Sequence, residues 1–451
     1  MDLFPLSGLF SLSGILPACL ALIIALICAQ LFVRNLASTQ SHEFAGIDGL
    51  RGLLALGVFL HHAVYWYSYA THGTWRFYSS GLYMSFGHAS VNMFFMLTGF
   101  LFSLKLIDGR TREIDWLKLY CSRVMRLTPL YICLVLGVVI IVTLDTHFRF
   151  KEDAFTLLRE LRSWLLFTIP GHPNINLRPH THLISAGVTW TLPYEWYFYL
   201  ILPCLGLLAG TKSKAGSGGW LTMSMLCVLC FSAWKLNIMM FLAFACGGTA
   251  AAIVRTPRLR AALHSPVSNL AVIGCLVAGY TCFEYSSLPC LLVLTTALIL
   301  LACGADVYGL LSTRSIRALS TVSYGVYLLQ GLVLHVVIMY IVPEQWRLAM
   351  TVNQYWGVVF VSTVILVGVS ALSWQLIESP AIAAAPKLAN WIRRHKTQNP
   401  ERKKVLNYRQ FSEQLMATRQ HQLPINKPRR AHIRQRYPLE SSVTHNKNTR
   451  S

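Results

Sequence analysis

Ionisable side chains lie inside a stretch that is otherwise apolar enough to cross a membrane. The stretch GIDGLRGLLALGVFLHHAVYWY, residues 46–67, carries Asp48 and Arg51 at its start and the adjacent His61 and His62 well inside. Titratable groups at membrane depth are costly, so their presence indicates a functional site. In a helix, Arg51 and His62 lie three turns plus about 20° apart and share a face with Asp48, whereas His61 points about 100° away.

The same spacing predicts the depth of each group. Arg51 and His62 differ by about 16 Å in rise, roughly half of a hydrocarbon core of about 30 Å. Arg51 is therefore expected at one entrance of the membrane and His62 near its middle, along one path. His62 could act as a general base or briefly carry the acyl group itself, or it could only hydrogen-bond a neighbouring helix.

Two further segments carry charge at helical spacing. In SRVMRLTPLY, residues 122–131, Arg123 and Arg126 are i,i+3 neighbours at the expected start of a helix. Paired guanidinium groups suit bidentate binding of phosphate, although an anchor at the membrane surface is an equally open reading. In VTWTLPYEWYFYLILP, residues 188–203, Glu195 is a lone carboxylate among aromatic residues. We expect it near the depth of His62, where the two could form an acid–base pair.

The composition predicts an all-α polytopic membrane protein. Of 451 residues, 54% are hydrophobic and only 13% are charged, and the mean hydropathy is +0.49. Runs of about 20 apolar residues recur along most of the chain, which is typical of membrane-spanning helices. We predict eleven such helices near residues 14–33, 47–68, 85–106, 124–144, 187–209, 219–235, 237–254, 268–283, 288–305, 319–342 and 354–378.

The distribution of charge predicts orientation rather than a nucleic-acid partner. The net charge is +21, and sixteen Lys/Arg against three acidic residues lie from Lys387 to the end. Most other basic residues lie in short loops that fall on one side, which the positive-inside rule makes cytoplasmic. The N-terminus is then outside and the C-terminus inside. The tail 387–451 is expected to be disordered and attracted to anionic lipids.

The polar segment 145–186 is expected outside, as a surface helix and a lid over an outward-facing cavity, or as a simple linker. Its histidines have no spacing typical of a metal site, so no bound metal is predicted.

Six segments, taken in order, resemble the membrane-bound acyltransferase 3 family over about residues 44–380. They are GIDGLRG with the Arg51-to-His62 spacing, NMFFMLTGFL, RVMRLTPLY, WTLPYEWYFYL, SYGVYLLQ and LIESP. The resemblance implies a membrane domain of ten core helices at 44–386. Residues 1–43 would then add one extra helix before it.

The resemblance also implies an activity and its partners. Such proteins transfer acyl groups, usually acetyl from acetyl-CoA, to hydroxyls of carbohydrates or lipid-linked glycans outside the cytoplasm, without a permanently bound cofactor. It makes Arg51, His62 and Glu195 the expected catalytic residues, and Arg51, Arg123 and Arg126 the expected acyl-CoA-binding residues. A bacterial inner membrane and other surface-polysaccharide biosynthesis proteins are the implied surroundings.

The chain also departs from the family pattern. Asn92 and Thr98 stand where an acidic residue and a serine are frequent, and Gln330 stands where a histidine is frequent. Many relatives append a soluble hydrolase-like domain, and no such segment is expected here, so a single-component mechanism is the simpler expectation. Two other readings stay open: a transporter, and a subunit that passes acyl groups to a separate transferase.

Overall fold

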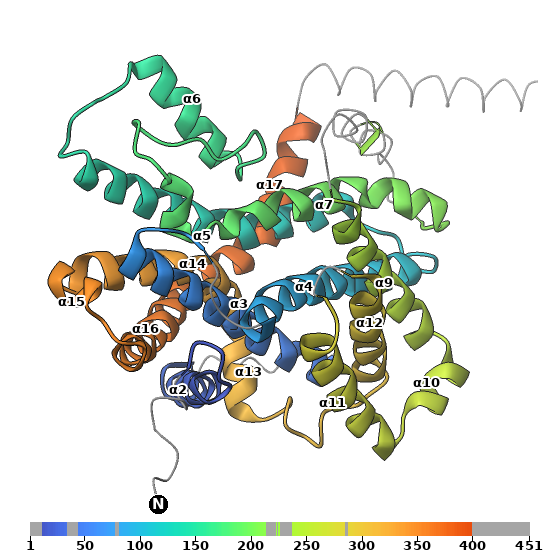
Figure 1. Cartoon of the computed structure of the whole chain (residues 1–451). Coiled ribbons are helices and arrows are strands. Elements are labelled where there is room, and N and C mark those ends of the chain that lie inside the picture. Colours follow the sequence, from blue (N-terminus) through green and yellow to red (C-terminus); the bar gives the residue numbers. More distant parts are fainter. Residues whose placement is uncertain are drawn as a thin grey trace, which may run out of the picture. The chain divides into compact units, whose positions relative to one another are not determined.

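The computed structural model describes residues 11–33, 44–76, 81–212, 222, 224–225, 237–284 and 287–398, and this part of the chain contains helices and no strands (Figure 1). The helix expected at 219–235 and the tail beyond 398 lie outside these residues. The long helices are α2 (Leu16–Val33), α3 (Ala45–His72), α4 (Gly81–Asp108), α5 (Trp116–Asp145), α7 (Thr191–Leu208), α9 (Ile238–Val254), α11 (Pro266–Thr281), α12 (Leu288–Ala302), α14 (Ser323–Val336), α16 (Val352–Ser373) and α17 (Ser379–Gln398).

Shorter elements complete the chain. They are α6 (Ala154–Leu165), the 3₁₀ turns η2 (Thr181–Ser185) and η3 (Val188–Trp190), α10 (Pro257–Leu263), α13 (Arg314–Thr321), α15 (Glu344–Leu348) and the π-helical turns η4 (Val337–Ile341) and η5 (Trp374–Glu378). The helix expected at 319–342 is thus broken at Val322. The first residues of the expected tail are helical, since α17 runs to Gln398.

The multi-pass membrane architecture is confirmed, whereas the count of eleven spans is not. Within the described residues, six helical stretches are long and apolar enough to cross a membrane: α2, α3, α4, α5, residues 323–341 and residues 352–395. A seventh span results if α9 and α10, which meet at 97°, count as one. Helices α11 and α12 are apolar but shorter, and α7 is not among the helices that are long and apolar enough to cross a membrane.

Glycines in α3 bring α13 and the residues just before it against the segment that carries Arg51. A Cβ at Gly49 would lie 2.1 Å from the Leu311 carbonyl oxygen, and one at Gly52 would lie 2.8 Å from the Ser320 amide nitrogen. The Gly52 amide donates to the Ser320 hydroxyl at 2.9 Å. Such small residues allow close helix packing where lipid supplies no hydrophobic drive. The contact therefore fixes the face of α3 on which Arg51 lies.

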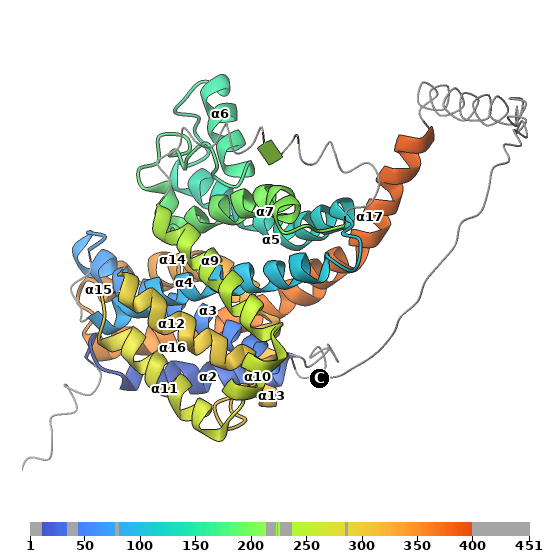
Figure 2. The same ribbon diagram turned by 90° about the vertical axis from the view of Figure 1, so that its right-hand side faces the viewer.

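Close packing at glycines also joins α4 to α9, the pair of described helices with the most extensive contact (Figure 2). A Cβ at Gly99 of α4 would lie 2.1 Å from the Phe244 carbonyl oxygen, and one at Gly247 of α9 would lie 1.9 Å from the Met96 carbonyl oxygen. Each glycine therefore receives the backbone of the other helix. This contact positions one apolar side of α4 and leaves the other side for the site described below.

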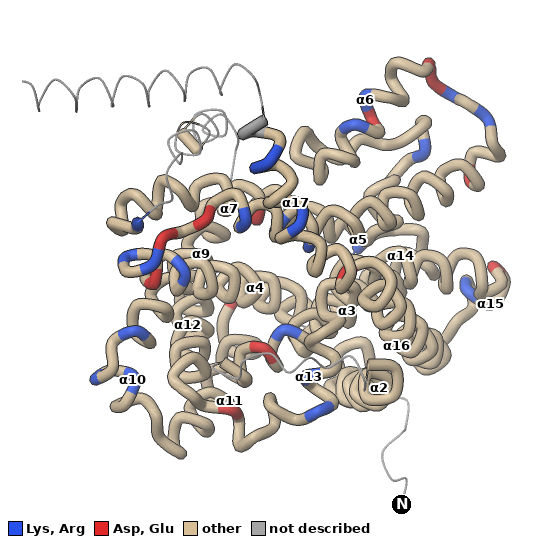
Figure 3. Tube along the Cα trace, turned by 180° about the vertical axis from the view of Figure 1, so that it is seen from behind, with Lys and Arg blue, Asp and Glu red and all other residues tan. Residues whose placement is uncertain are grey.

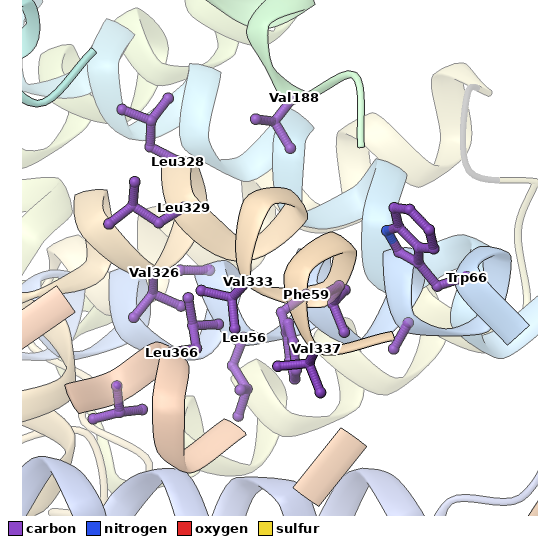
Figure 4. Close-up of a cluster of buried hydrophobic side chains, with 14 of the residues drawn as sticks. Leu56, Phe59, Trp66, Val188, Val326, Leu328, Leu329, Val333, Val337 and Leu366 are labelled. Carbon is purple, nitrogen blue, oxygen red and sulfur yellow. The ribbon is translucent and has the colours of Figure 1, made fainter. Parts of the chain in front are cut away.

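A cluster of buried apolar side chains holds α3, α14 and α16 together. Leu56 and Phe59 of α3 lie against Val333 of α14 and Leu366 of α16, and all four are at most 7% exposed (Figure 4). Burial of such side chains is worth roughly 1.5–3 kcal/mol each in water, but in lipid the gain comes chiefly from close packing. His62 follows Phe59 by three residues, so the cluster sets the position of the imidazole relative to α14.

The basic segments meet at one end of the bundle, which we call the basic end. Arg255, after α9, forms an ion pair of 2.8 Å with Asp108, at the end of α4. The Lys212 amide, after α7, donates to the Gly109 carbonyl at 2.7 Å. Figure 3 shows further basic positions on α10 and α13. This clustering agrees with one-sided loop charges; we call the opposite end the far end.

The segment between α5 and α7 folds back into the bundle. The Tyr131 hydroxyl donates to the Trp164 carbonyl at 2.5 Å, and Phe167 stacks on Tyr131 with ring centroids 4.4 Å apart. Tyr131 lies fourteen residues before Asp145, the last residue of α5, or about 21 Å along the axis. The turn at 164–168 thus lies beside the middle of α5, and the simple linker reading is wrong.

The chain then returns to the far end and descends again. Arg178 pairs with Asp145 at 2.6 Å, at the end of α5. Next, Ser185 packs on α14, where a Cβ at Gly331 would lie 2.1 Å from the Ser185 carbonyl carbon. Helix α7 therefore begins at Thr191, beside the middle of its neighbours, and not at the far end as expected for a helix at 187–209.

The orientation of the two ends is testable by cysteine labelling. We expect Lys151→Cys, between α5 and α6, to react with a membrane-impermeant maleimide in intact cells, and Arg314→Cys, at the start of α13, to react only after permeabilisation. Both positions are exposed, and the background chain should carry serine at the cysteines that are exposed among the described residues, Cys19, Cys133 and Cys282. Reaction of both variants from the same side would contradict the orientation by positive charge.

Candidate functional site

A cavity of about 340 Å³ lies among α3, α4, α5, α7 and α14. Helix α4 supplies most of its apolar wall, and α3, α5 and α7 supply its charged wall. The residues that line it are Arg51, Val91, Phe94, Phe95, Leu97, Thr98, Leu101, Phe102, Ser122, Arg123, Arg126, Leu127, Thr191, Leu192, Glu195, Tyr199, Ser323, Tyr324, Tyr327 and Ile382. One half of the cavity can therefore take an anion and the other an apolar group.

All three predicted arginines line this cavity together with Glu195. Arg51 projects from α3, while Arg123 and Arg126 project from one face of α5. Glu195 of α7 interacts electrostatically with all three guanidinium groups. The structure thus brings together four residues that lie up to 144 positions apart in the chain.

The depth of Arg123 and Arg126 differs from the expectation. Helix α5 starts at Trp116, with the Asp115 side chain accepting from the Lys118 amide at 3.0 Å. Arg123 therefore lies about 10 Å past the helix start, at 1.5 Å per residue. A surface anchor has no need to be that deep, whereas a residue that binds a ligand within the bundle does.

A tyrosine holds Glu195 and Arg123 in place. The Tyr199 hydroxyl, one turn after Glu195 on α7, donates to the Glu195 carboxylate at 3.1 Å, and Tyr199 also hydrogen-bonds the Arg123 side chain. The Arg123 guanidinium lies 5.2 Å from the Phe102 ring centroid, a cation–π distance. Tyr120 donates to the Tyr199 carbonyl at 2.8 Å and so fixes this turn of α7.

Positive charge exceeds negative charge on the cavity surface. Asp48 and Glu378 interact with Arg51 and Arg126, but neither carboxylate is among the residues that line the cavity. Facing the cavity, three guanidinium groups therefore oppose the single carboxylate of Glu195. Arginine clusters of this kind bind phosphate groups through charge-assisted hydrogen bonds.

His62 lies outside this cavity, and the expected pairing with Glu195 is wrong. The His62 Nδ1 atom lies 3.5 Å from the Gln330 Oε1 atom of α14, and His62 does not line the cavity. The reason is the position of α7. The sequence predicts a helix that starts at the far end, but α7 begins at Thr191, beside the middle of the bundle. Glu195 is therefore displaced toward the basic end, where the arginines are.

One turn of α14 connects His62 to the cavity. The Gln330 Nε2 atom donates to the Tyr327 carbonyl at 2.9 Å. Tyr327 lines the cavity, and its hydroxyl lies 2.8 Å from the Thr191 hydroxyl. His62 is thus one layer of side chains beyond the cavity.

Sequence reasoning assigned no chemical role to Gln330, Tyr327 or Tyr199. Tyr199 could have been found, because i,i+4 residues are neighbours on a helix.

The adjacent His61 has a different environment. Its Nδ1 atom lies 2.9 Å from the Tyr83 carbonyl oxygen, and its ring packs on α4, where a Cβ at Gly87 would lie 2.4 Å from it. The predicted divergence of the two histidines is confirmed, since His61 contacts α4 and His62 contacts α14. In the described part of the chain, no group of three or more His, Cys, Asp or Glu side chains is arranged to hold a metal ion.

Comparison with known proteins identifies a family. The family model described as an acyltransferase domain matches residues 44–374. The O-acetyltransferase OatA of Staphylococcus aureus (strain NCTC 8325 / PS 47) is 27% identical over 165 residues, which cover 35% of this chain and 24% of that protein. The putative peptidoglycan O-acetyltransferase YrhL of Bacillus subtilis (strain 168) is 27% identical over 343 residues, 64% of this chain and 48% of that protein.

The chain thus spans less than half the length of either relative. No solved structure matches the chain.

The arginine cavity predicts stabilisation by a phosphate anion. We expect pyrophosphate to raise the melting temperature of the purified protein, because a ligand at 100 times its Kd stabilises by about 2.7 kcal/mol. In Arg126→Ala the rise should fall to less than half, whereas Arg112→Ala, an exposed residue outside the cavity, should keep it. Each shift is measured at constant ionic strength against the variant's own baseline. An unchanged shift of the melting temperature in Arg126→Ala would contradict an anion site in this cavity.

Proposed function

Because the chain belongs to the acyltransferase 3 family over residues 44–374, we propose that it is an integral membrane O-acyltransferase. It would transfer an acyl group, in the simplest case acetyl, from acyl-CoA on the cytoplasmic side to a hydroxyl of an extracytoplasmic carbohydrate. Both relatives are named O-acetyltransferases, which supports the reaction, and the name of YrhL, a putative peptidoglycan O-acetyltransferase, supports a cell-wall polymer as acceptor. The observation that carries the proposal is the arginine cavity, with its apolar wall, inside the family domain.

The cavity suits the donor in charge and shape. CoA carries phosphates at one end and a thioester at the end of a long, largely uncharged arm, and such an anion cannot cross hydrocarbon. Its phosphates would bind Arg51, Arg123 and Arg126, and its arm would lie along the α4 wall at Phe94 and Leu97. Glu195 and Tyr199 would act on the donor side, by holding Arg123 in the orientation that meets the phosphates.

His62 would serve as the general base. Its imidazole takes the proton of the acceptor hydroxyl as the oxygen attacks the thioester carbonyl carbon. The tetrahedral intermediate then collapses to the ester, the carbon–sulfur bond breaks, and the imidazolium returns the proton to the leaving thiolate. The thioester must reach His62 from the cavity, and the layer to be passed is the Thr191–Tyr327 pair.

The acceptor would approach from the far end, where the segment 145–190 re-enters the bundle. Non-helical backbone at membrane depth is tolerated where it is buried in protein or lines a water-filled cavity. Ser185 lies on Gly331, next to Gln330 and thus at the level of His62. A carbohydrate polymer or a lipid-linked glycan could meet His62 there, supplied by other proteins of surface-polymer biosynthesis. No residue of 145–186 lines the arginine cavity, so any lid function concerns the acceptor side.

Donor affinity is expected to depend on the paired arginines. Arg123→Ala and Arg126→Ala should each raise the KM for acetyl-CoA about tenfold or more, because each loses a charge-assisted contact of roughly 1.5–3 kcal/mol. The KM for the acceptor should change less than twofold. The measurement is a titration of labelled acetyl-CoA with purified protein in proteoliposomes, with Arg112→Ala as the matched control. Unchanged titration curves in both variants would leave the arginines as anchors only.

The two adjacent histidines provide the sharpest test of the reaction itself. His62→Ala should lower acyl transfer by about 10²–10⁴-fold, the usual contribution of a general base. His61→Ala should keep most of the activity, because it loses only a packing contact or a hydrogen bond of about 0.6 kcal/mol on average in a membrane. Both variants are compared at equal expression with labelled acetyl-CoA and peptidoglycan fragments.

Three outcomes would decide against the proposal. Equal losses from His61→Ala and His62→Ala would make the pair structural. Uptake of acetyl-CoA into proteoliposomes without ester formation would favour a transporter. Release of CoA without modification of the acceptor, unless a second protein is added, would favour an acyl-relay subunit.

A further inference from the structure

We infer that Gln330 is a positioning residue for His62: its amide oxygen holds the imidazole with the proton on Nδ1 and so leaves Nε2 as the basic nitrogen. The inference deepens the proposed function and rests on it. It concerns a residue at which the sequence suggested no role, since an amide replaces the histidine frequent in the family. The argument depends on the hydrogen-bond direction at each atom of the amide.

The amide of Gln330 has its orientation fixed by its own helix. Its Nε2 atom donates to the Tyr327 carbonyl at 2.9 Å, so its Oε1 atom faces His62. The side chain is 0% exposed, so this oxygen is shielded from bulk solvent. Because a carbonyl oxygen only accepts, the nitrogen that faces it must carry the proton, and that nitrogen is Nδ1. The imidazole also hydrogen-bonds the Val58 backbone, one turn earlier on α3, so α3 and Gln330 orient it together. A neutral imidazole has one N–H, so its lone pair lies on Nε2.

The surrounding turn of α14 cannot easily move away. On one side Gly331 contacts the Ser185 backbone, where a Cβ would lie only 2.1 Å from the Ser185 carbonyl carbon. On the other side the Tyr327 hydroxyl lies 2.8 Å from the Thr191 hydroxyl. Gln330 is therefore held between two contacts from the re-entrant segment and the start of α7. The 3.5 Å separation from His62 is long for a hydrogen bond, as is common before substrate binds.

A neutral partner has a specific consequence for the reaction. The amide orients the imidazole but does not neutralise the imidazolium that forms when the hydroxyl proton is taken. The other titratable side chains beside His62 are His61, whose ring centroid lies 5.0 Å from that of His62, and His88 of α4, and neither supplies a negative charge. The proton is then best passed at once to the leaving thiolate, without a long-lived charge in an apolar layer. A carboxylate in the same place would stabilise the imidazolium instead, as the aspartate of a Ser-His-Asp triad does. The two partners predict different pH dependences.

Substitutions at this position separate positioning from simple packing. Gln330→Leu should lower kcat at least tenfold while the KM for acetyl-CoA changes less than twofold, because the donor cavity is not altered. Gln330→Glu should keep much of the activity but move the acidic limb of the pH–rate profile about one unit higher, since the carboxylate favours the protonated imidazole. The control is Thr363→Val on α16, which removes another fully buried polar group, one that bonds only its own helix at Val359.

A double-mutant cycle makes the test specific to His62. In a His62→Ala background, Gln330→Leu should cause no further loss of the residual transfer, because there is no imidazole left to orient. A kcat for Gln330→Leu equal to that of Thr363→Val, or a tenfold further loss in the His62→Ala background, would overturn the inference. An unshifted pH profile in Gln330→Glu would do the same. Wild-type protein without any acyl transfer would instead refute the proposed function.

Discussion

The arrangement of the helices depends on holding three guanidinium groups together inside a membrane protein. Charged groups of one sign repel each other more strongly away from water, so they need compensating contacts. Arg51 has Asp48 behind it, Arg126 has Glu378, and Arg123 has the Tyr199 hydroxyl and the Phe102 ring. Each of these compensating groups belongs to a helix or helical turn that packs within the bundle. The cavity is therefore preorganised, and a polyanion that enters it replaces repulsion with attraction.

The short α7 and the re-entrant segment follow from the same requirement. Glu195 can reach the arginines because α7 begins at Thr191, beside the middle of its neighbours, and ends near Trp116 at the basic end. The space beside the far half of the neighbouring helices is then filled by the segment 145–190, whose short helices and turns leave backbone polar groups that need partners. Two of these groups have partners: the Trp164 carbonyl, near the end of α6, accepts from Tyr131, and the Ile175 amide donates to the Thr181 hydroxyl at 3.1 Å.

The sequence predicted what depends on helical periodicity and missed what depends on where a helix begins. The shared face of Arg51 and His62 and the divergence of His61 follow from 3.6 residues per turn, and the structure agrees on His61. The pairing of Glu195 with His62 failed because composition does not distinguish a full span from a half span preceded by re-entrant chain. Hydropathy also carries no information on the close contacts of Gly49 and Gly247, which need the partner backbone to be seen.

Separation of the arginines from His62 has a chemical reason. Three cations next to an imidazole would oppose its protonation by the acceptor hydroxyl, since like charges destabilise the charged form. The layer formed by Thr191, Tyr327 and Gln330 places neutral hydrogen-bonding groups between them. In the proposed reaction, the donor phosphates would bind at the arginines, while His62 would keep neutral hydrogen-bonding neighbours. An extended donor such as acyl-CoA, with its charge at one end and its reactive carbonyl at the other, matches two such sites at different depths.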